Sequence, residues 1–164
     1  LWHLARGLDS RAVSSNSKIK SISNETTFND DISDPDLLEG HIWRMAEKVS
    51  DRAKAKGMAG SVVTLKLKRS DFSLVTKRTS LDDPTQMADR LFRTARDLFG
   101  QVTHSKPYRL LGVGLSHLLP EDDADRTGNL LDPNQDTRFG AERATDKIRA
   151  RFGEDAIVKG RSLR

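Results

Sequence analysis

The sequence predicts an α+β fold in which a four-stranded antiparallel sheet carries two helices on one face. Four segments alternate apolar and polar residues with the period of a strand, and two others repeat apolar residues with the period of a helix. These segments follow one another in the order β-α-β-β-α-β, which is typical of the split βαβ, ferredoxin-like arrangement. An acidic tail and a short C-terminal helix are expected after this unit.

The first strand and helix are predicted from residue 19 onward. The segment IKSISNETTF alternates Ile, Thr and Phe with polar residues and is rich in strand formers. The next helix has a clear start, with Asp34 in the N-cap position and Pro35 in the first turn. Its apolar residues recur at helical steps: Leu38, Ile42, Met45, Val49 and Ala53. This stripe predicts a helix that packs on the sheet and ends near Gly57.

The two middle strands are predicted to form a hairpin, GSVVTLKLKRSDFSLVTKRTSL, with its turn near residues 69–71. Leucine and valine alternate with lysine in the first of these strands, so Thr64, Lys66 and Lys68 are expected to point away from the helices. Continuing the alternation places Lys77 and Thr79 on that same outer side. It also assigns Phe72 to the core.

The second helix and the last strand complete the unit. Asp83 and Pro84 repeat the helix-start signature, Gly100 is the expected end, and the apolar stripe is Met87, Leu91, Ala95 and Leu98. In the strand KPYRLLGVGLSHL, one face carries Leu111, Val113 and Leu115, and the other carries Leu110, Gly112, Gly114 and Ser116. Two glycines on one face of a strand indicate the close approach of another backbone.

The chain beyond Leu118 has a different character. Residues 121–136 carry six acids and one arginine and are predicted to be a solvated connector. The segment GAERATDKIRARF returns to helical spacing, with Ala144, Ile148 and Phe152 expected to face inward.

Composition limits the function classes. The chain has 164 residues, 32% of them charged, a formal charge of +4 and no cysteine, which excludes disulfides and thiolate metal sites. No apolar run is long enough to cross a membrane and no signal peptide is visible, so a cytoplasmic protein without a membrane partner is expected. The first residue is Leu within a helical pattern, which indicates a piece of a longer protein.

Positive charge is concentrated in the hairpin segment, which contains five Lys and Arg residues and only one acid, an Asp. Lysines, hydroxyls and glycine backbone on the outer side of a sheet suit the phosphate oxygens of nucleic acid. A merely solvated lysine face is the alternative. RNA recognition of the RRM type requires aromatic residues for base stacking, and the strands offer only Phe28, Phe72 and Tyr108. Contact with a duplex backbone therefore fits better.

Four stretches, LWHLARGLDSRAV, KSISNETTF, VTLKLKRSDFSLVTKRTSL and YRLLGVGLSHL, together resemble the Y-family translesion DNA polymerases of the bacterial polymerase IV (DinB-like) group. The resemblance covers most of residues 1–118. It implies the end of a thumb domain at 1–13, a linker at 14–19, the little finger domain at 20–119, and an acidic connector with a helix at 120–164.

The little finger of that family grips the phosphates of primer-template duplex DNA so that the enzyme can copy damaged template. Carried over to this chain, the implied DNA-binding residues are Lys20, Ser23, Thr26, Thr64, Lys66, Lys68, Lys77, Arg78, Thr79, Arg109, Leu110, Gly112, Gly114 and Ser116. Relatives often have Arg at the positions of Leu110 or Gly114, and some have a basic residue at Thr26. These departures imply a weaker electrostatic attraction between this domain and the DNA phosphates.

The resemblance places the catalytic carboxylates and their Mg²⁺ in a palm domain upstream of Leu1. The acid pairs at 30–31 and 122–123 are interpreted as structural or solvated, and the four histidines show no ligand spacing. This segment is therefore expected to hold no cofactor and to be inactive as a DNA polymerase.

A sliding clamp is a further candidate partner. The family commonly carries a clamp-docking peptide near this point of the chain, and Leu130 and Leu131 occupy a similar place, although the usual Gln and aromatic residue are missing. Local packing of the two leucines is the alternative. A protein-interaction module that binds a clamp or an acidic partner therefore stays open beside DNA binding.

Overall fold

The computed structural model describes residues 2–9, 18–103, 105–125 and 134–160. The elements are η1 (Leu4–Arg6), β1 (Ser21–Ile32), α1 (Pro35–Lys54), β2 (Met58–Arg69), β3 (Leu74–Thr85), α2 (Ala88–Gly100), β4 (Tyr108–Pro120), η2 (Glu121–Asp123), α3 (Gln135–Phe152) and η3 (Glu154–Ala156). Within these described ranges no helix is both long and apolar enough to span a lipid bilayer.

The four strands form one antiparallel sheet in the order β1-β4-β2-β3. Both βαβ units are split, because β4 lies between β1 and β2, and β2 lies between β3 and β4. The predicted fold class is confirmed. The central strands are β4 and β2, whereas a ferredoxin-like sheet has its first and third strands at the centre, so the likeness stops at the order of elements.

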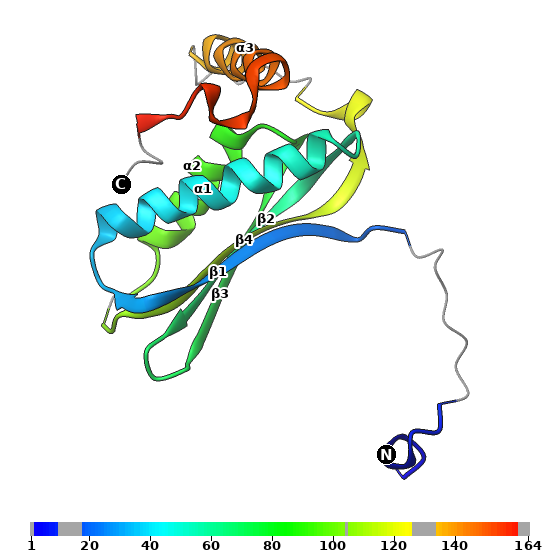
Figure 1. The fold of residues 1–164 in the computed structure, drawn as a ribbon, viewed down its shortest axis with the longest axis vertical. Coiled ribbons are helices and arrows are strands. Elements are labelled where there is room, and N and C mark those ends of the chain that lie inside the picture. Colours follow the sequence, from blue (N-terminus) through cyan, green and yellow to red (C-terminus); the bar gives the residue numbers. More distant parts are fainter. Residues whose placement is uncertain (1, 10–17, 104, 126–133, 161–164) are drawn as a thin grey trace.

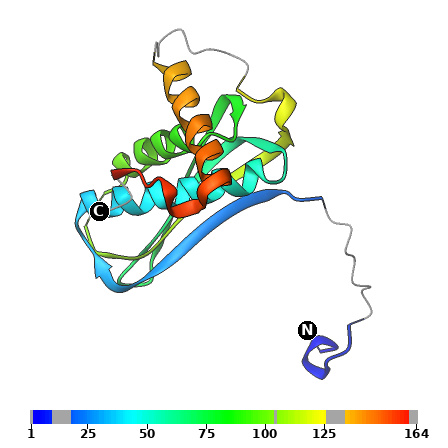
Figure 2. The same ribbon diagram turned by 45° about the horizontal axis from the view of Figure 1, so that its top comes forward.

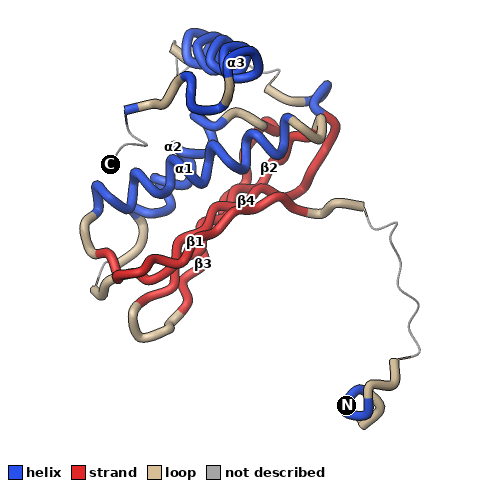
Figure 3. Tube along the Cα trace, in the orientation of Figure 1, coloured by secondary structure: helices blue, strands red, loops and turns tan. Residues whose placement is uncertain are grey.

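Helices α1 and α2 lie on one side of the sheet (Figure 1), and helices and strands therefore form separate layers (Figure 3). We call the side under the helices the covered face; its central residues are Ile22, Val63, Leu65, Leu67, Leu111, Val113 and Leu115, all of them buried. Helix α3 lies across the outer side of α1 and α2 (Figure 2). No described element covers the other side of the sheet.

The start and the stripe of α1 are as predicted. Asp34 accepts a hydrogen bond from the backbone N–H of Asp36 at 2.9 Å, and Pro35 is the first helical residue. All five residues of the predicted stripe are buried. Gly57 has a φ of +58°, a left-handed conformation that few other residues adopt without strain, and it lets the chain turn into β2.

The predicted start of α2 is wrong. Asp83 and Pro84 belong to β3, which continues to Thr85 because Thr85 pairs with Gly60 of β2. The helix begins at Ala88, and its N-cap residue, Met87, has no side chain that can cap it. The predicted stripe and the end of α2 at Gly100 are confirmed, since all four stripe residues are buried.

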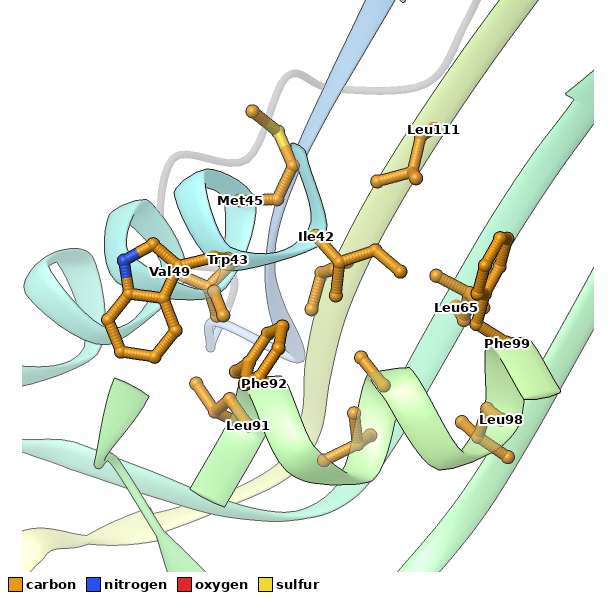
Figure 4. Packing of buried hydrophobic residues seen from close by; sticks show 14 of the residues in the cluster. Ile42, Trp43, Met45, Val49, Leu65, Leu91, Phe92, Leu98, Phe99 and Leu111 are labelled. Atoms are coloured by element: carbon orange, nitrogen blue, oxygen red, sulfur yellow. The ribbon is translucent and has the colours of Figure 1, made fainter. Parts of the chain in front are cut away.

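The core fills the space between the covered face and the two helices (Figure 4). Ile42 of α1, Leu65 of β2 and Leu111 of β4 are almost completely buried. Burial of each such side chain stabilises the fold by roughly 1.5–3 kcal/mol. Trp43 and Phe92 join the two helices edge to face, with ring centroids 5.2 Å apart.

Helix α3 is attached mainly through polar groups, so the predicted inward face of Ala144, Ile148 and Phe152 is wrong. All three are exposed, and the buried residues of α3 are Gln135, Phe139 and Glu142. Ion pairs then join α3 to the two helices beneath it: Glu142 and Asp146 to Lys54, Arg138 to Asp89, and Arg149 to Glu47.

Glu142 supplies the cap that α2 lacks. Its carboxylate accepts hydrogen bonds from the backbone N–H groups of Ala88 and Asp89 at 2.8 and 3.1 Å. Burial alone would raise the pKa of Glu142, but the positive charge of Lys54 and these N–H donors outweigh it and hold that pKa below its usual value. A charged carboxylate from one helix thus satisfies the N-terminal backbone donors of another.

Candidate nucleic-acid interface

The open face is the side of the sheet away from the helices, and its residues form four rows across the strands in the order β3-β2-β4-β1. The rows are Ser80-Val62-Ser116-Ser21, Arg78-Thr64-Gly114-Ser23, Thr76-Lys66-Gly112-Glu25 and Leu74-Lys68-Leu110-Thr27. Side chains alternate along each strand, so residues paired across the sheet point to the same side. The open face therefore presents hydroxyls, cations and two glycines.

The cations of the open face differ in their partners. Lys66 forms an ion pair of 2.8 Å with Glu25, and both side chains remain substantially exposed. Lys68 lies with its amine 5.0 Å from the centre of the Phe72 ring. Arg78 is exposed, and no ion pair with another described residue involves it. Three cations against one acid give the open face a net positive charge.

The two glycines have different surroundings. A Cβ on Gly112 would lie 2.8 Å from the Cβ of Glu25, so at this point it is the neighbouring strand β1 that approaches closely. A Cβ on Gly114 would lie 3.4 Å from that of Ser23, which is an ordinary contact. A shallow hollow of about 310 Å³ lies over both glycines and is bordered by Ser23, Thr64 and Lys66, among others.

The register corrects part of the predicted outer side. Lys77 and Thr79 pair with Leu65 and Val63 and therefore belong to the covered side of the edge strand β3. Thr26 pairs with Leu111 and is also on the covered side. The outward placement predicted for Lys77 and Thr79 is therefore wrong, because residues of opposite parity along a strand point to opposite faces. Thr26, an implied DNA contact, does not lie on the open face.

The other predicted contact residues keep a place on or near the open face. Those on the four rows are Ser23, Thr64, Lys66, Lys68, Arg78, Leu110, Gly112, Gly114 and Ser116. Lys20 is exposed just before β1. Arg109 lies beside the hairpin turn, with its guanidinium carbon 4.2 Å from the centre of the Phe72 ring.

Sequence reasoning missed Glu25, the acid that pairs with Lys66 across Gly112. A signal for it exists in the alternation around Ile22, a core residue. That alternation places Ser21, Ser23 and Glu25 on the opposite side of β1.

The aromatic residues do not form a stacking platform at the centre of the open face. Tyr108 is buried, with 1% of its surface exposed, and Phe28 packs half-buried against His41. Phe72 was expected in the core, but 60% of its surface is exposed at the turn between β2 and β3. That prediction is wrong, and the open face lacks the central aromatic residues that RRM-type base stacking requires.

The hairpin turn is held by a network around Asp71. Its carboxylate accepts hydrogen bonds from the N–H and hydroxyl of Ser73 at 3.0 and 2.6 Å, and Lys106 donates to it at 2.6 Å. These donors, Lys106 first, hold the pKa of Asp71 well below its usual range. The turn is thereby tied to the start of β4.

Two further predictions concern metal ions and the sliding clamp. In the described ranges no three His, Asp or Glu side chains come together as ligands for a metal ion. Leu130 and Leu131, the predicted clamp contacts, lie outside the described residues.

Comparison with known proteins places the chain in a family. Residues 19–130 match the model of the impB/mucB/samB family C-terminal domain. The chain is 44% identical over 160 residues to DNA polymerase IV of Brucella melitensis and 42% identical over 165 residues to that of Caulobacter vibrioides. These alignments cover 98% and 100% of this chain but only 36% and 40% of the relatives, so the chain spans about two fifths of their length.

Solved structures share the fold. A Y-family DNA polymerase chimera of Dbh and Dpo4 superposes with a TM-score of 0.58 at 16% identity, over 73% of this chain and 34% of that one. The little finger domain of PolIV, solved in a complex with the beta-clamp processivity factor, superposes with a TM-score of 0.51 at 24% identity, over 67% and 97%. The chain belongs to the impB/mucB/samB family, because residues 19–130 match the model of that family's C-terminal domain, and its β-α-β-β-α-β unit has the fold of the little finger domain of PolIV.

Proposed function

We propose that this domain binds duplex DNA through the open face and contacts the sugar-phosphate backbone without reading the base sequence. The observation that carries the proposal is the chemistry of the four rows, which present cations, hydroxyls and glycine backbone with a single acid. Such groups bind phosphates and carry no base code. The helices occupy the covered face, which leaves the open face as the broad side available to a duplex.

Each kind of residue has a separate task in this proposal. Lys68 and Arg78 neutralise phosphates, and the hydroxyls of Ser23, Thr64 and Ser116 donate hydrogen bonds to phosphate oxygens. The hollow over Gly112 and Gly114 accepts part of the backbone. A phosphate that binds Lys66 competes with Glu25, so this lysine contributes less than its full charge.

The names of the relatives support a wider proposal for the parent protein. We infer that it is a DNA-directed DNA polymerase that copies damaged template, and that this domain holds the primer-template duplex. The catalytic carboxylates and their Mg²⁺ would then lie in a part of the protein outside this segment, and the segment alone would be inactive. Nucleotide incorporation by the full-length protein, and none by the segment, is the expected result.

The binding proposal is tested with fluorescence anisotropy of a labelled duplex at increasing salt. Full neutralisation of two phosphates by Lys68 and Arg78, and partial neutralisation of a third by Lys66, predict a slope of log K against log [salt] between about −1.8 and −2.7, from roughly −0.9 per contact. Lys66→Glu plus Lys68→Glu should lower the affinity and flatten the slope. Lys48→Glu plus Arg96→Glu, which reverses two exposed charges on the helices, is the matched control. An affinity independent of salt, or an equal loss in both double variants, would contradict the proposal.

Clamp binding is the second candidate, supported by the solved complex of the beta-clamp processivity factor with the little finger domain of PolIV, which shares this fold. We propose that Leu130 and Leu131 contribute to it. The double change Leu130→Ala plus Leu131→Ala should weaken binding to a purified bacterial clamp in a pull-down or by surface plasmon resonance. Unchanged affinity would remove these leucines from the proposal.

A further inference from the structure

The turn between β2 and β3 places a bulky aromatic residue in an unusual backbone conformation. Phe72 has a φ of +67°, a left-handed conformation that costs free energy for a bulky side chain. Its ring gains little burial in return, because 60% of its surface is exposed. Residues held in such conformations concentrate at functional sites.

The strained conformation is fixed by its neighbours. The N–H of Phe72 donates to the carbonyl of Arg69 at 2.9 Å, and the N–H of Arg69 donates to the carbonyl of Ser73 at 2.9 Å. Ser70 donates to the carbonyl of Pro107 at 2.9 Å, and Asp71 is bound by Lys106. The turn is therefore anchored to the chain at the start of β4 and presents the ring in a defined position.

Two cations lie over the Phe72 ring, and two leucines belong to the adjoining row of the open face. The Arg109 guanidinium lies 4.2 Å and the Lys68 amine 5.0 Å from the ring centre. Leu74, 57% exposed, and Leu110 belong to the adjoining row of the open face, which also contains Lys68. We call Phe72, Leu74, Leu110, Lys68 and Arg109 the hairpin corner. An exposed ring flanked by cations is the arrangement that binds single-stranded nucleic acid by stacking and charge.

We propose that the hairpin corner binds an unpaired base of single-stranded DNA that continues from the duplex, with Phe72 stacking on the base and Lys68 and Arg109 neutralising the adjoining phosphates. This proposal rests on duplex binding by the open face, because Lys68 belongs to both surfaces. A strand leaving the duplex at this end of the sheet would pass directly over the corner.

A purely structural role for Phe72 predicts something different. Cation–π contacts at exposed positions are weak, and their loss would affect the hairpin alone. The observation that distinguishes the two roles is therefore a preference of the protein for a duplex with a single-stranded extension over a blunt duplex. That preference should depend on the ring and not on the fold of the turn.

The test compares two labelled probes on the full chain: a blunt duplex and the same duplex with a single-stranded oligo(dT) extension. Phe72→Asn removes the ring while keeping a residue that tolerates the left-handed conformation. It should reduce affinity for the extended probe by at least about fivefold, the lower end of the range for loss of one base–aromatic stack. Affinity for the blunt duplex should stay the same.

Two more variants complete the design. Phe72→Trp should restore the preference for the extended probe. Phe152→Asn is the matched control, since Phe152 is 66% exposed and also lies beside a cation, Arg151, but belongs to α3. It should change neither affinity.

The two proposals fail in different ways. If the unmodified chain binds the extended probe but not the blunt duplex, duplex binding fails, and a loss of that binding in Phe72→Asn would still support the corner. If it binds neither probe, both proposals are overturned. If both probes bind equally well, or if Phe72→Asn weakens both to the same extent, the assignment of the hairpin corner to an unpaired base is overturned.

Discussion

The covered face and the open face are made of the same four strands, yet they have opposite chemistry. Leu111 on β4 is completely buried under the helices, while Leu110, its neighbour in the chain, borders the open face. On β3, Arg78 points to the open face and Lys77 to the covered side. Strand alternation therefore separates the residues that stabilise the fold from those proposed to bind DNA. Adjacent pairs of residues can test this separation.

The largest expected difference concerns folding stability. Leu111→Ala removes a fully buried side chain and should lower the free energy of unfolding by about 2–5 kcal/mol. Leu110→Ala, one residue away, should change it by no more than about 0.5–1 kcal/mol. Urea unfolding measures both. Similar losses in the two variants would break the distinction between the faces.

A smaller loss of folding stability is expected where α3 joins the two helices that cover the sheet. Glu142→Gln removes the charge that pairs with Lys54 and weakens the cap on α2, and should cost about 1–3 kcal/mol. Arg143→Gln, an exposed neighbour, is the control. Amide hydrogen exchange in α3 and in the first turn of α2 should accelerate only in Glu142→Gln. If it accelerates equally in both variants, the polar attachment of α3 is refuted.

The smallest effect concerns pH. Partial burial, and then the charge of Arg44, lower the pKa of His41 from 6.5 to about 4. The unfolded chain therefore takes up a proton at a higher pH than the folded chain, and stability falls as the pH drops from 6.5 towards 4. Solvent screening limits the loss to about 1 kcal/mol near pH 5. Thermal unfolding of His41→Gln should show a flatter pH profile than that of the unmodified chain. An identical profile would contradict this.

The sequence was sufficient for elements whose apolar pattern is long. The stripe of α1 and the alternation in β2 and β4 predicted the covered face, because burial of apolar surface dictates those patterns. The order of the strands was not predictable in this way, since every antiparallel order buries the same residues. Glu25 was also missed: the alternation around Ile22 places it on the open face, but its pairing with Lys66 depends on the order of the strands.

Three errors have identifiable physical causes. Lys68 of β2 pairs with Leu74 of β3, so the even-numbered residues of β3 point to the open face. The prediction put the odd-numbered residues there. It therefore placed Lys77 and Thr79 on the wrong side and Phe72 in the core. An Asp-Pro pair starts α1, but the second pair, Asp83 and Pro84, stays within β3 because β3 pairs with β2 up to Thr85. Helix α3 is held by ion pairs, which leave no apolar stripe in the sequence.

The central claim is that the open face, and not the charge of the hairpin as a whole, binds duplex DNA. The most direct measurement compares duplex affinity and its salt slope for Arg78→Glu and Lys77→Glu, two exposed neighbours with the same change of charge. We expect Arg78→Glu to weaken binding severalfold and to reduce the slope by about 1, and Lys77→Glu to have a clearly smaller effect. Equal losses in the two variants, or the larger loss in Lys77→Glu, would contradict the account.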